Sequence, residues 1–197
     1  MLPKIFKPYK SPRKNLVRIG PKKDGGYVID KRVIKKSGTI ITCGLNDDWE
    51  FEKDFLKFNK NCKVIAYDHT VDNEFWNKRF KKNLIDFIKF KKLNLKKIID
   101  VFKHYEYRSF FKYKNHHHIK KVVLNEKKRN EISIKSILSN QKNILLKVDI
   151  EGDEYNLLKK INKEYKKINL LIIEFNEVFK NIKKIKKFIL SRKFKII

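Results

Sequence analysis

Cysteine, glycine and long apolar runs are all scarce in this chain of 197 residues. Its two cysteines, Cys43 and Cys62, have neither the spacing of zinc ligands nor the number that a disulfide framework needs, so we expect a reducing cytoplasm. No apolar run approaches the roughly 20 residues of a membrane-spanning helix, and the start shows no apolar stretch typical of a secretory signal. We therefore expect a cytoplasmic protein without a membrane span, long enough to bury one core.

Proline occurs only near the start of the chain. All four prolines lie in residues 1–36, which predicts an extended entry segment ahead of one domain over residues 37–197. Within the entry segment, Arg18–Ile29 has the pattern of strand, tight turn and strand, with the turn at Asp24-Gly25-Gly26. An ordinary hairpin explains this pattern as well as a functional motif does.

Arginine is rare for so basic a protein. The net charge is +28, yet only seven of the 50 basic residues are arginine. A basic surface favours nucleic acid because phosphate binding releases counterions, but specific recognition of phosphates and bases depends strongly on arginine. We interpret the lysines as a surface coat and do not expect nucleic acid to be the main partner.

Acidic residues are few, and most of them are clustered. Fourteen of the 22 fall in four groups, each directly after an apolar run typical of a buried strand. The groups are Asp47–Asp54, Asp68–Glu74, Asp149–Glu154 and Glu174–Glu177. Because the ligand crevice of a parallel sheet lies at the carboxyl ends of its strands, this pattern predicts an anionic rim at that edge. Solvated turns whose acids favour helix N-termini are the simpler alternative.

Apolar runs alternate with amphipathic stretches along the chain. A weaker strand at Ile119–Leu124 follows a loop at His116-His117-His118, and Phe194–Ile197 begins a further strand. The alternation is typical of an α/β fold with a doubly wound, mostly parallel sheet, which is the fold class we predict. The runs predicted as buried strands are Thr39–Cys43, Lys63–Tyr67, Ile144–Val148 and Ile168–Ile173.

Two amphipathic helices are predicted between the second strand and the histidines. Over residues 74–91, Trp76, Phe80, Leu84 and Ile88 recur at helical spacing, and a second helix covers residues 95–105. We expect the apolar residues of both helices to pack in the core and not to form a stacking platform for bases. The other predicted helices begin at Asp47 or cover Ser133–Leu138, Asp153–Tyr165 and Phe179–Leu190.

Gly44 and Asp68 follow the first two strands and together suggest a nucleoside site. The glycine lets the backbone approach a ligand, and a carboxylate after the second strand can accept both ribose hydroxyls. The glycine-rich dinucleotide motif and the P-loop are absent, and the acids that begin at Asp47 disfavour a pyrophosphate at the next helix. S-adenosylmethionine has an adenosine, two cationic groups and no phosphate, so it suits an anionic rim better than NAD or ATP.

The segment Leu146-Lys-Val-Asp-Ile-Glu-Gly-Asp-Glu-Tyr155 resembles a motif of the FkbM-type methyltransferases. Ile172–Glu177 is similar to the following strand of that family, and Asp24-Gly-Gly-Tyr-Val28 looks like an entry motif of one branch. The Gly44–Phe55 segment and Tyr67-Asp68-His69 have the order that the family shows. The resemblance covers about residues 16–197.

This resemblance implies a class I, Rossmann-like methyltransferase that uses S-adenosylmethionine. It implies that Asp68 holds the ribose, with His69 beside it among the cofactor-binding residues. Asp149 would lie beside the reacting methyl group, and Glu151 and Glu174 would shape the acceptor side. The residues implied to contact the methionine part of the cofactor are Gly44, Leu45, Asn46 and Asp47.

Two departures from the family pattern concern the cofactor turn and the end of the chain. The glycine-rich turn is reduced to Cys43-Gly-Leu-Asn-Asp-Asp48, and the chain ends at Ile197, within the expected sixth strand. We therefore expect a C-terminally shortened domain that lacks the final strand of the family. A truncated, inactive homologue that binds cofactor or has only a structural role is the first alternative function.

Methyl transfer to a hydroxyl needs an oriented acceptor and a base for its proton. Asp149 is the candidate base, because neighbouring acids raise the proton affinity of a carboxylate. Lys147 lies two residues earlier, on the same strand face, and could counter this charge, although burial for the sheet alone explains it equally well. A divalent metal held by Asp149, Glu151 and Glu174 is conceivable on ligand chemistry, but nothing defines a coordination geometry, so no metal site is predicted.

The predicted function is S-adenosylmethionine-dependent O-methylation of a sugar, glycan or small-metabolite hydroxyl. A third hypothesis, after the inactive homologue, is an RNA-binding protein that uses the Lys-rich helices around Asn77–Lys114. The sequence does not identify the acceptor or the oligomeric state.

Overall fold

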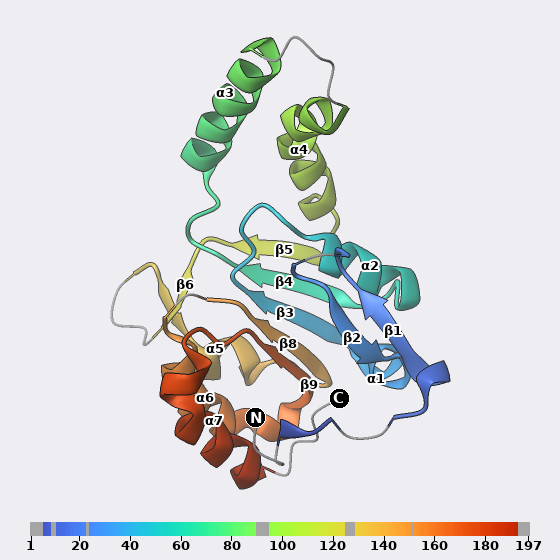
Figure 1. Ribbon diagram of the computed structural model, residues 1–197, viewed down its shortest axis with the longest axis vertical. Coiled ribbons are helices and arrows are strands. Elements are labelled where there is room, and N and C mark those ends of the chain that lie inside the picture. The colour runs from blue at the N-terminus through green and yellow to red at the C-terminus, as the bar shows by residue number, and fades with distance from the viewer. Residues whose placement is uncertain are drawn as a thin grey trace.

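The structure, a computed structural model, describes residues 6–8, 11–22, 24–89, 95–124, 129–150 and 152–192. Its centre is a parallel sheet of five strands in the order β5-β4-β3-β8-β9 (Figure 1). This confirms the predicted α/β class and is compatible with a Rossmann-like fold. The strands are β3 (Thr39–Cys43), β4 (Lys63–Tyr67), β5 (His116–Ile119), β8 (Ile144–Val148) and β9 (Ile168–Ile173).

The strand order reverses between β3 and β8. From β3 the chain runs outward through β4 to β5 and then returns to the other side of β3, where it forms β8 and β9. Every residue of β3 and β8 is buried, which explains their continuous apolar runs. Helices and a hairpin flank the sheet: α1 (Lys31–Lys36), α2 (Glu50–Phe58), α5 (Ile134–Ser139), α6 (Glu154–Glu164) and α7 (Val178–Arg192).

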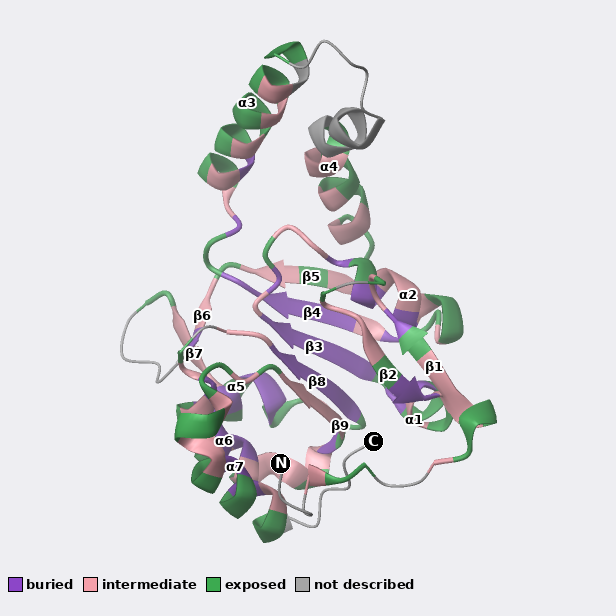
Figure 2. Cartoon of the chain, in the orientation of Figure 1, coloured by how far each residue is buried: buried purple, intermediate pink, exposed green. Residues whose placement is uncertain are grey.

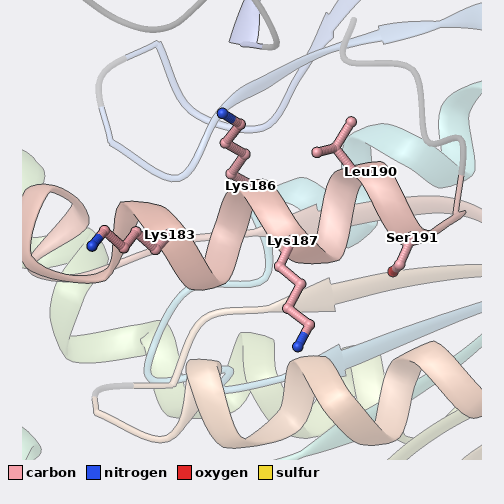
Figure 3. A pocket seen from close by; sticks show the side chains of 5 residues that line it. All are labelled: Lys183, Lys186, Lys187, Leu190 and Ser191. Carbon is pink, nitrogen blue, oxygen red and sulfur yellow. The ribbon is translucent and has the colours of Figure 1, made fainter.

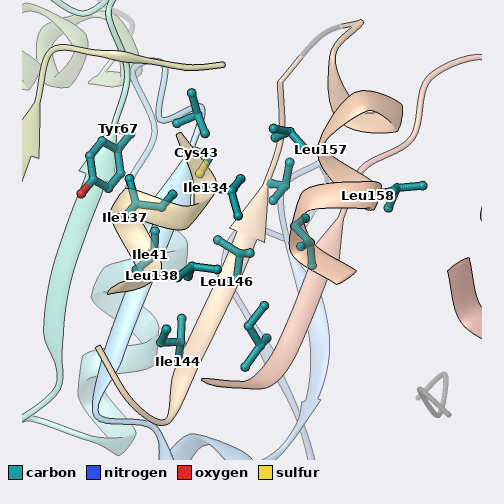
Figure 4. Packing of buried hydrophobic residues seen from close by; sticks show 14 of the residues in the cluster. Ile41, Cys43, Tyr67, Ile134, Ile137, Leu138, Ile144, Leu146, Leu157 and Leu158 are labelled. Carbon is teal, nitrogen blue, oxygen red and sulfur yellow. The ribbon is translucent and has the colours of Figure 1, made fainter. Parts of the chain in front are cut away.

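Alternate side chains of the sheet enter two separate cores. On one face, Ile41, Leu146 and Val148 pack with residues of α5 and α6 such as Leu138 and Leu157 (Figure 4). On the other face, residues of β3, β4 and β8 meet α1, α2 and the N-terminal hairpin; this core contains Ile19, Ile29, Ile34, Ile40, Phe51, Phe55, Val64 and Leu145. The sheet is therefore covered on both sides, as the apolar runs predict.

The predicted N-terminal hairpin is confirmed. Strand β1 (Leu16–Ile19) pairs antiparallel with β2 (Tyr27–Asp30), after a short 3-10 turn at Arg13–Asn15. Asp30 ends the hairpin and is the N-cap of α1, because its side chain accepts a hydrogen bond from the backbone N–H of Arg32. The hairpin brings Tyr27 to the carboxyl edge of the main sheet.

The prediction for residues 116–124 is wrong in its boundaries. The histidines form the edge strand β5, which pairs with β4, and are not a loop. The predicted strand at Ile119–Leu124 is divided: Ile119 ends β5, and β6 (Val122–Leu124) pairs with β7 (Glu131–Ser133) in a separate parallel sheet. Because β5 pairs with β4, which lies far earlier in the chain, the local pattern cannot reveal this edge strand. The predicted strand at Phe194–Ile197 lies outside the described residues.

Helices α3 (Asn73–Lys89) and α4 (Leu95–Phe111) project away from the sheet (Figure 1). The spacing of apolar residues predicted both helices, but the expected burial is wrong for Phe80, Leu84 and Ile88 of α3 and for Phe102 and Tyr105 of α4. Trp76 is buried in a cluster at the base, whereas Phe80, Leu84 and Ile88 are exposed (Figure 2).

Among the described residues, no helix is long and apolar enough to cross a membrane. The last described helical turn before β9 is a 3-10 turn at Tyr165–Lys167.

Candidate functional site

A cavity of about 540 Å³ lies at the carboxyl ends of β3, β4 and β8. The cavity is thus next to the point where the strand order reverses, which is where open α/β sheets bind their ligands. It includes Gly44, Asp68 and Asp149, three residues that the sequence placed in the site. The full lining is Gly44, Asn46, Tyr67, Asp68, His69, Thr70, Lys121, Val122, Val123, Asp149, Ile150 and Asp153.

Gly44 ends β3 in close contact with the backbone that follows β8. Its φ is +86°, and a Cβ atom at this position would lie 1.8 Å from the carbonyl oxygen of Asp149. The backbone N–H of Asp149 in turn donates to the carbonyl of Cys43 at 2.8 Å. A side chain at residue 44 would therefore separate the two strand ends, so glycine is required here by the sheet itself and also leaves the cavity open.

Asp68 follows β4 and holds two loops at the cavity. One carboxylate oxygen accepts the backbone N–H groups of Leu45 and Asn46, each at 2.8 Å. The other accepts the N–H of Thr70 at 2.8 Å and its hydroxyl at 2.6 Å. Burial alone would raise the pKa of Asp68, but the hydrogen bonds from Thr70, Asn46 and Leu45 outweigh it and lower the pKa below its ordinary value. Asp68 is therefore a fixed anion in the cavity wall.

His118, which the sequence placed in a loop, supports Asp68 from the edge strand. Its Nε2 lies 2.9 Å from the carbonyl oxygen of Asp68 and must donate, because a carbonyl only accepts. Its Nδ1 is consequently the acceptor for the hydroxyl of Tyr107, on α4. Burial lowers the pKa of His118, in agreement with this neutral tautomer. His117 is exposed and His118 is partly buried, an alternation that three identical residues do not reveal in the sequence.

Lys147 and Asp149 form the pair that their spacing predicts. Lys147 is 6% exposed, and its Nζ lies 3.8 Å from Oδ2 of Asp149. The ammonium group also lies 5.9 Å from the ring centroid of Phe51, on α2. The two side chains therefore form an ion pair at the end of β8, with Lys147 buried and Asp149 partly exposed.

Tyr27 and Glu174 meet on the hairpin side of Asp149. The hydroxyl of Tyr27 donates to Oε2 of Glu174 at 3.1 Å, and its ring packs edge-on against Phe51 with 5.7 Å between centroids. Burial raises the pKa of Tyr27, and the charges of Glu174 and Asp149 raise it further, so the phenol stays a hydrogen-bond donor. The entry motif therefore brings a neutral donor to the predicted acceptor side.

The remaining predicted residues do not all reach the cavity. Asn46 lines it with a φ of +50°, and His69 lines it as an exposed residue. Leu45 is buried beside Trp49 and contributes its backbone N–H. Asp47 forms ion pairs with Arg79 of α3 and Lys103 of α4, and it is not in the lining.

Several acidic residues have positions that the sequence could not specify. Glu151 lies outside the described residues, so its predicted role is not addressed. Glu52 and Glu154 are fully buried; the hydroxyl of Thr42 donates to Glu52, and the N–H of Asn176 donates to Glu154 at 2.9 Å. Within the described ranges, no three His, Cys, Asp or Glu side chains are grouped so that they could hold a metal ion.

A second hollow lies on α7 and has a different character. It is lined by Lys183, Lys186, Lys187, Leu190 and Ser191, all from this one helix. Figure 3 shows that the three lysine side chains point in different directions. Diverging side chains on a single helix cannot surround a ligand, so we assign no site there.

Comparison with known proteins identifies no relative. No family model, curated protein or solved structure matches the chain. The cavity at the strand ends and the charged residues around it are therefore the basis for a functional interpretation.

Proposed function

We propose that the chain binds S-adenosylmethionine in the cavity at the strand ends and methylates a hydroxyl of a sugar, glycan or small metabolite. The main support is the position of the cavity beside Gly44, Asp68 and Asp149, where the strand order reverses. This is the place expected for the nucleoside cofactor of a class I methyltransferase, to which the sequence motifs are similar.

The residues present fit such a cofactor. The lining has three carboxylates, from Asp68, Asp149 and Asp153, and they suit a ligand with sulfonium and ammonium groups. Tyr67, Val122 and Val123 supply apolar surface for a nucleoside base, and the volume falls in the range of small-ligand pockets. The bound cofactor would supply an electrophilic methyl group.

Three residues have distinct roles in this proposal: Asp149, which lines the cavity, and Lys147 and Glu174, which lie outside its lining. Asp149 accepts the proton of the acceptor hydroxyl as the oxygen attacks. Lys147, whose Nζ lies 3.8 Å from Oδ2 of Asp149, counters the charge of this carboxylate. Glu174, held by the phenol of Tyr27, accepts a further hydrogen bond from the acceptor and so orients it.

A structural module without catalytic activity is the second candidate function. The carboxylate of Asp68 already accepts four hydrogen bonds from the protein, so ribose hydroxyls could bind it only in place of one of these donors. This saturation favours a role for Asp68 in holding the loops together.

Calorimetric titration with S-adenosylmethionine and S-adenosylhomocysteine tests the proposal. Val122→Trp would fill the cavity without touching the hydrogen bonds of Asp68, whereas Val28→Trp makes the same substitution on the exposed face of β2. We expect binding by the native chain, a loss of about tenfold or more for Val122→Trp, and native affinity for Val28→Trp. A folded native chain that binds neither compound would refute the proposal in favour of the structural module.

A further inference from the structure

The helical arm, defined here as α3 and α4 beyond Trp76 and Tyr107, has an unusual surface. It contains six of the eleven large apolar side chains that are exposed in the described part of the chain. On α3 they form an apolar stripe at helical spacing, defined as Phe80, Leu84, Ile85 and Ile88, with exposed fractions of 44%, 39%, 50% and 72%. Phe102 and Tyr105 of α4 add two exposed aromatic rings.

The sheet does not need this surface for its own core. Among the residues of α3 and α4 whose burial is described, only Trp76 is buried, and it packs at the base of the arm with Trp49 and Tyr107. Beyond that cluster the arm extends away from the rest of the protein (Figure 2). An apolar stripe on a projecting helix is costly in water, which indicates that it has a partner.

The charge of α3 indicates what kind of partner its apolar stripe would bind. Helix α3 contains five Lys or Arg and two Asp or Glu residues, so its net charge is +3. Arg79 and Lys78 pair with Asp47 and Glu74. Three further lysines are exposed: around the helix Lys81 lies between Ile88 and Ile85, and Lys82 and Lys89 lie beyond Ile85 at the edge of the apolar stripe. A helix with an apolar stripe and a basic flank is typical of a segment that lies on a membrane surface.

We propose that the apolar stripe of α3 docks the protein onto the surface of an anionic lipid bilayer. The apolar side chains enter the boundary between headgroups and acyl chains, and the lysines contact the anionic headgroups. RNA fits the lysines but leaves Leu84, Ile85 and Ile88 uncovered, because aliphatic side chains offer no ring on which bases can stack. A second copy of the chain would bring two basic helices together, and their like charges oppose that pairing.

Sedimentation with lipid vesicles tests this docking on the full chain and does not depend on the proposed methyl transfer. The vesicles contain either phosphatidylcholine alone or phosphatidylcholine with about 30% phosphatidylserine. We expect the native chain to bind the anionic vesicles about tenfold more tightly, with the affinity falling as salt rises.

Two variants separate the apolar and basic contributions. The double variant Leu84→Asp/Ile88→Asp replaces two of the four side chains of the stripe with charged ones, and Lys81→Glu/Lys82→Glu reverses two charges; each should lower the affinity about tenfold or more. Phe179→Asp changes an even more exposed apolar residue on α7 and should bind like the native chain. All changed side chains are exposed, and circular dichroism confirms that each variant is folded.

Insertion is measured with an environment-sensitive dye on Ile88→Cys, because both native cysteines are buried and remain unlabelled. The dye should report an apolar environment only with anionic vesicles. The proposal is overturned if the native chain does not bind the vesicles, if Leu84→Asp/Ile88→Asp binds as tightly as the native chain, or if the dye stays in water. Light scattering that shows a dimer abolished by the same double variant would instead assign the stripe to self-association.

Discussion

The carboxylate of Asp68 connects the end of β4 to the loop that follows β3. Its four hydrogen bonds join the backbone of Leu45 and Asn46 to Thr70, and all of them go to the ionised form. The N–H groups of Leu45 and Asn46 lie in the loop after β3, and both donate to this carboxylate. A residue predicted to bind a ligand thus has a structural role that can be measured without any ligand.

Asp68→Asn should destabilise the fold. An amide can present only one acceptor oxygen, so at least one N–H at the site loses its partner or meets another donor, at a cost of about 2 kcal/mol. Urea unfolding of both chains at neutral pH measures this free energy. The exposed Glu50→Gln, on α2, removes a comparable charge and should change the free energy of unfolding by less than about 0.5 kcal/mol. Equal stability of Asp68→Asn and the native chain would contradict the described network.

The first turn of α1 is held in place by one ionised residue at the end of the hairpin. Asp30 accepts hydrogen bonds from the backbone N–H of Arg32 at 2.9 Å, from its guanidinium Nε at 3.0 Å, and from the hydroxyl of Ser11 at 3.2 Å. The hydrogen bond from the Arg32 side chain is the main cause that lowers the pKa of Asp30 to about 2.

This shift makes the stability of the protein depend on pH in a defined window. Because the pKa is lower in the folded state than the ordinary 3.8, Asp30 stabilises the fold fully above pH 4 and loses this contribution as pH falls towards 2. In Asp30→Ser the serine can still cap the helix, but it does not titrate. We expect the free energy of unfolding of this variant to fall by about 1–2 kcal/mol less between pH 6 and pH 2 than that of the native chain. Urea unfolding from pH 2 to pH 6 checks this, and a native and a variant profile of equal slope would disprove it.

Most elements of the sheet could be predicted from the sequence, because buried parallel strands must be apolar throughout. Thr39–Cys43 and Lys63–Tyr67 match β3 and β4, and the acids after them lie at the expected edge. The edge strand β5 was missed because its outer side lacks a neighbour among the described strands, so His117 can be exposed there. Tertiary contacts that no local pattern encodes decide such cases.

The candidate site was predictable to a smaller extent. Gly44, Asp68 and Asp149 meet at one cavity because parallel strands bring their carboxyl ends together. The sequence placed Asp47 at the cofactor, but its carboxylate forms ion pairs with Arg79 and Lys103. Both partners come from the helical arm, so the sequence near Asp47 could not reveal them. The contribution of His118 depends on β5 and on Tyr107, and so it also required the tertiary structure.

At the scale of the whole molecule, both cysteines are enclosed by the two cores. Cys43 belongs to the core that contains α5 and α6, and Cys62 to the core on the opposite face. Burial raises the pKa of each thiol to about 12, which makes both poor nucleophiles at neutral pH.

Thiol reactivity should therefore report unfolding of the entire protein. We expect the native chain to react with a thiol reagent such as Ellman's reagent at least about 100-fold more slowly than the chain in urea. Reaction rates across a urea series should follow the unfolding curve measured by circular dichroism. Rapid labelling of either cysteine in the native chain would show that the corresponding core opens locally.

The central position of β3 has a consequence for how the chain reaches this structure. On one side β3 pairs with β4, which follows after about twenty residues, but on the other side Thr39 pairs with Ile144, more than a hundred residues later. During synthesis one edge of an entirely buried strand stays open until β8 has left the ribosome, and such edges attract other chains. Non-local pairing of this kind also slows folding. Recovery from denaturant should accordingly fall as protein concentration rises, and chaperones that shield strand edges should restore it.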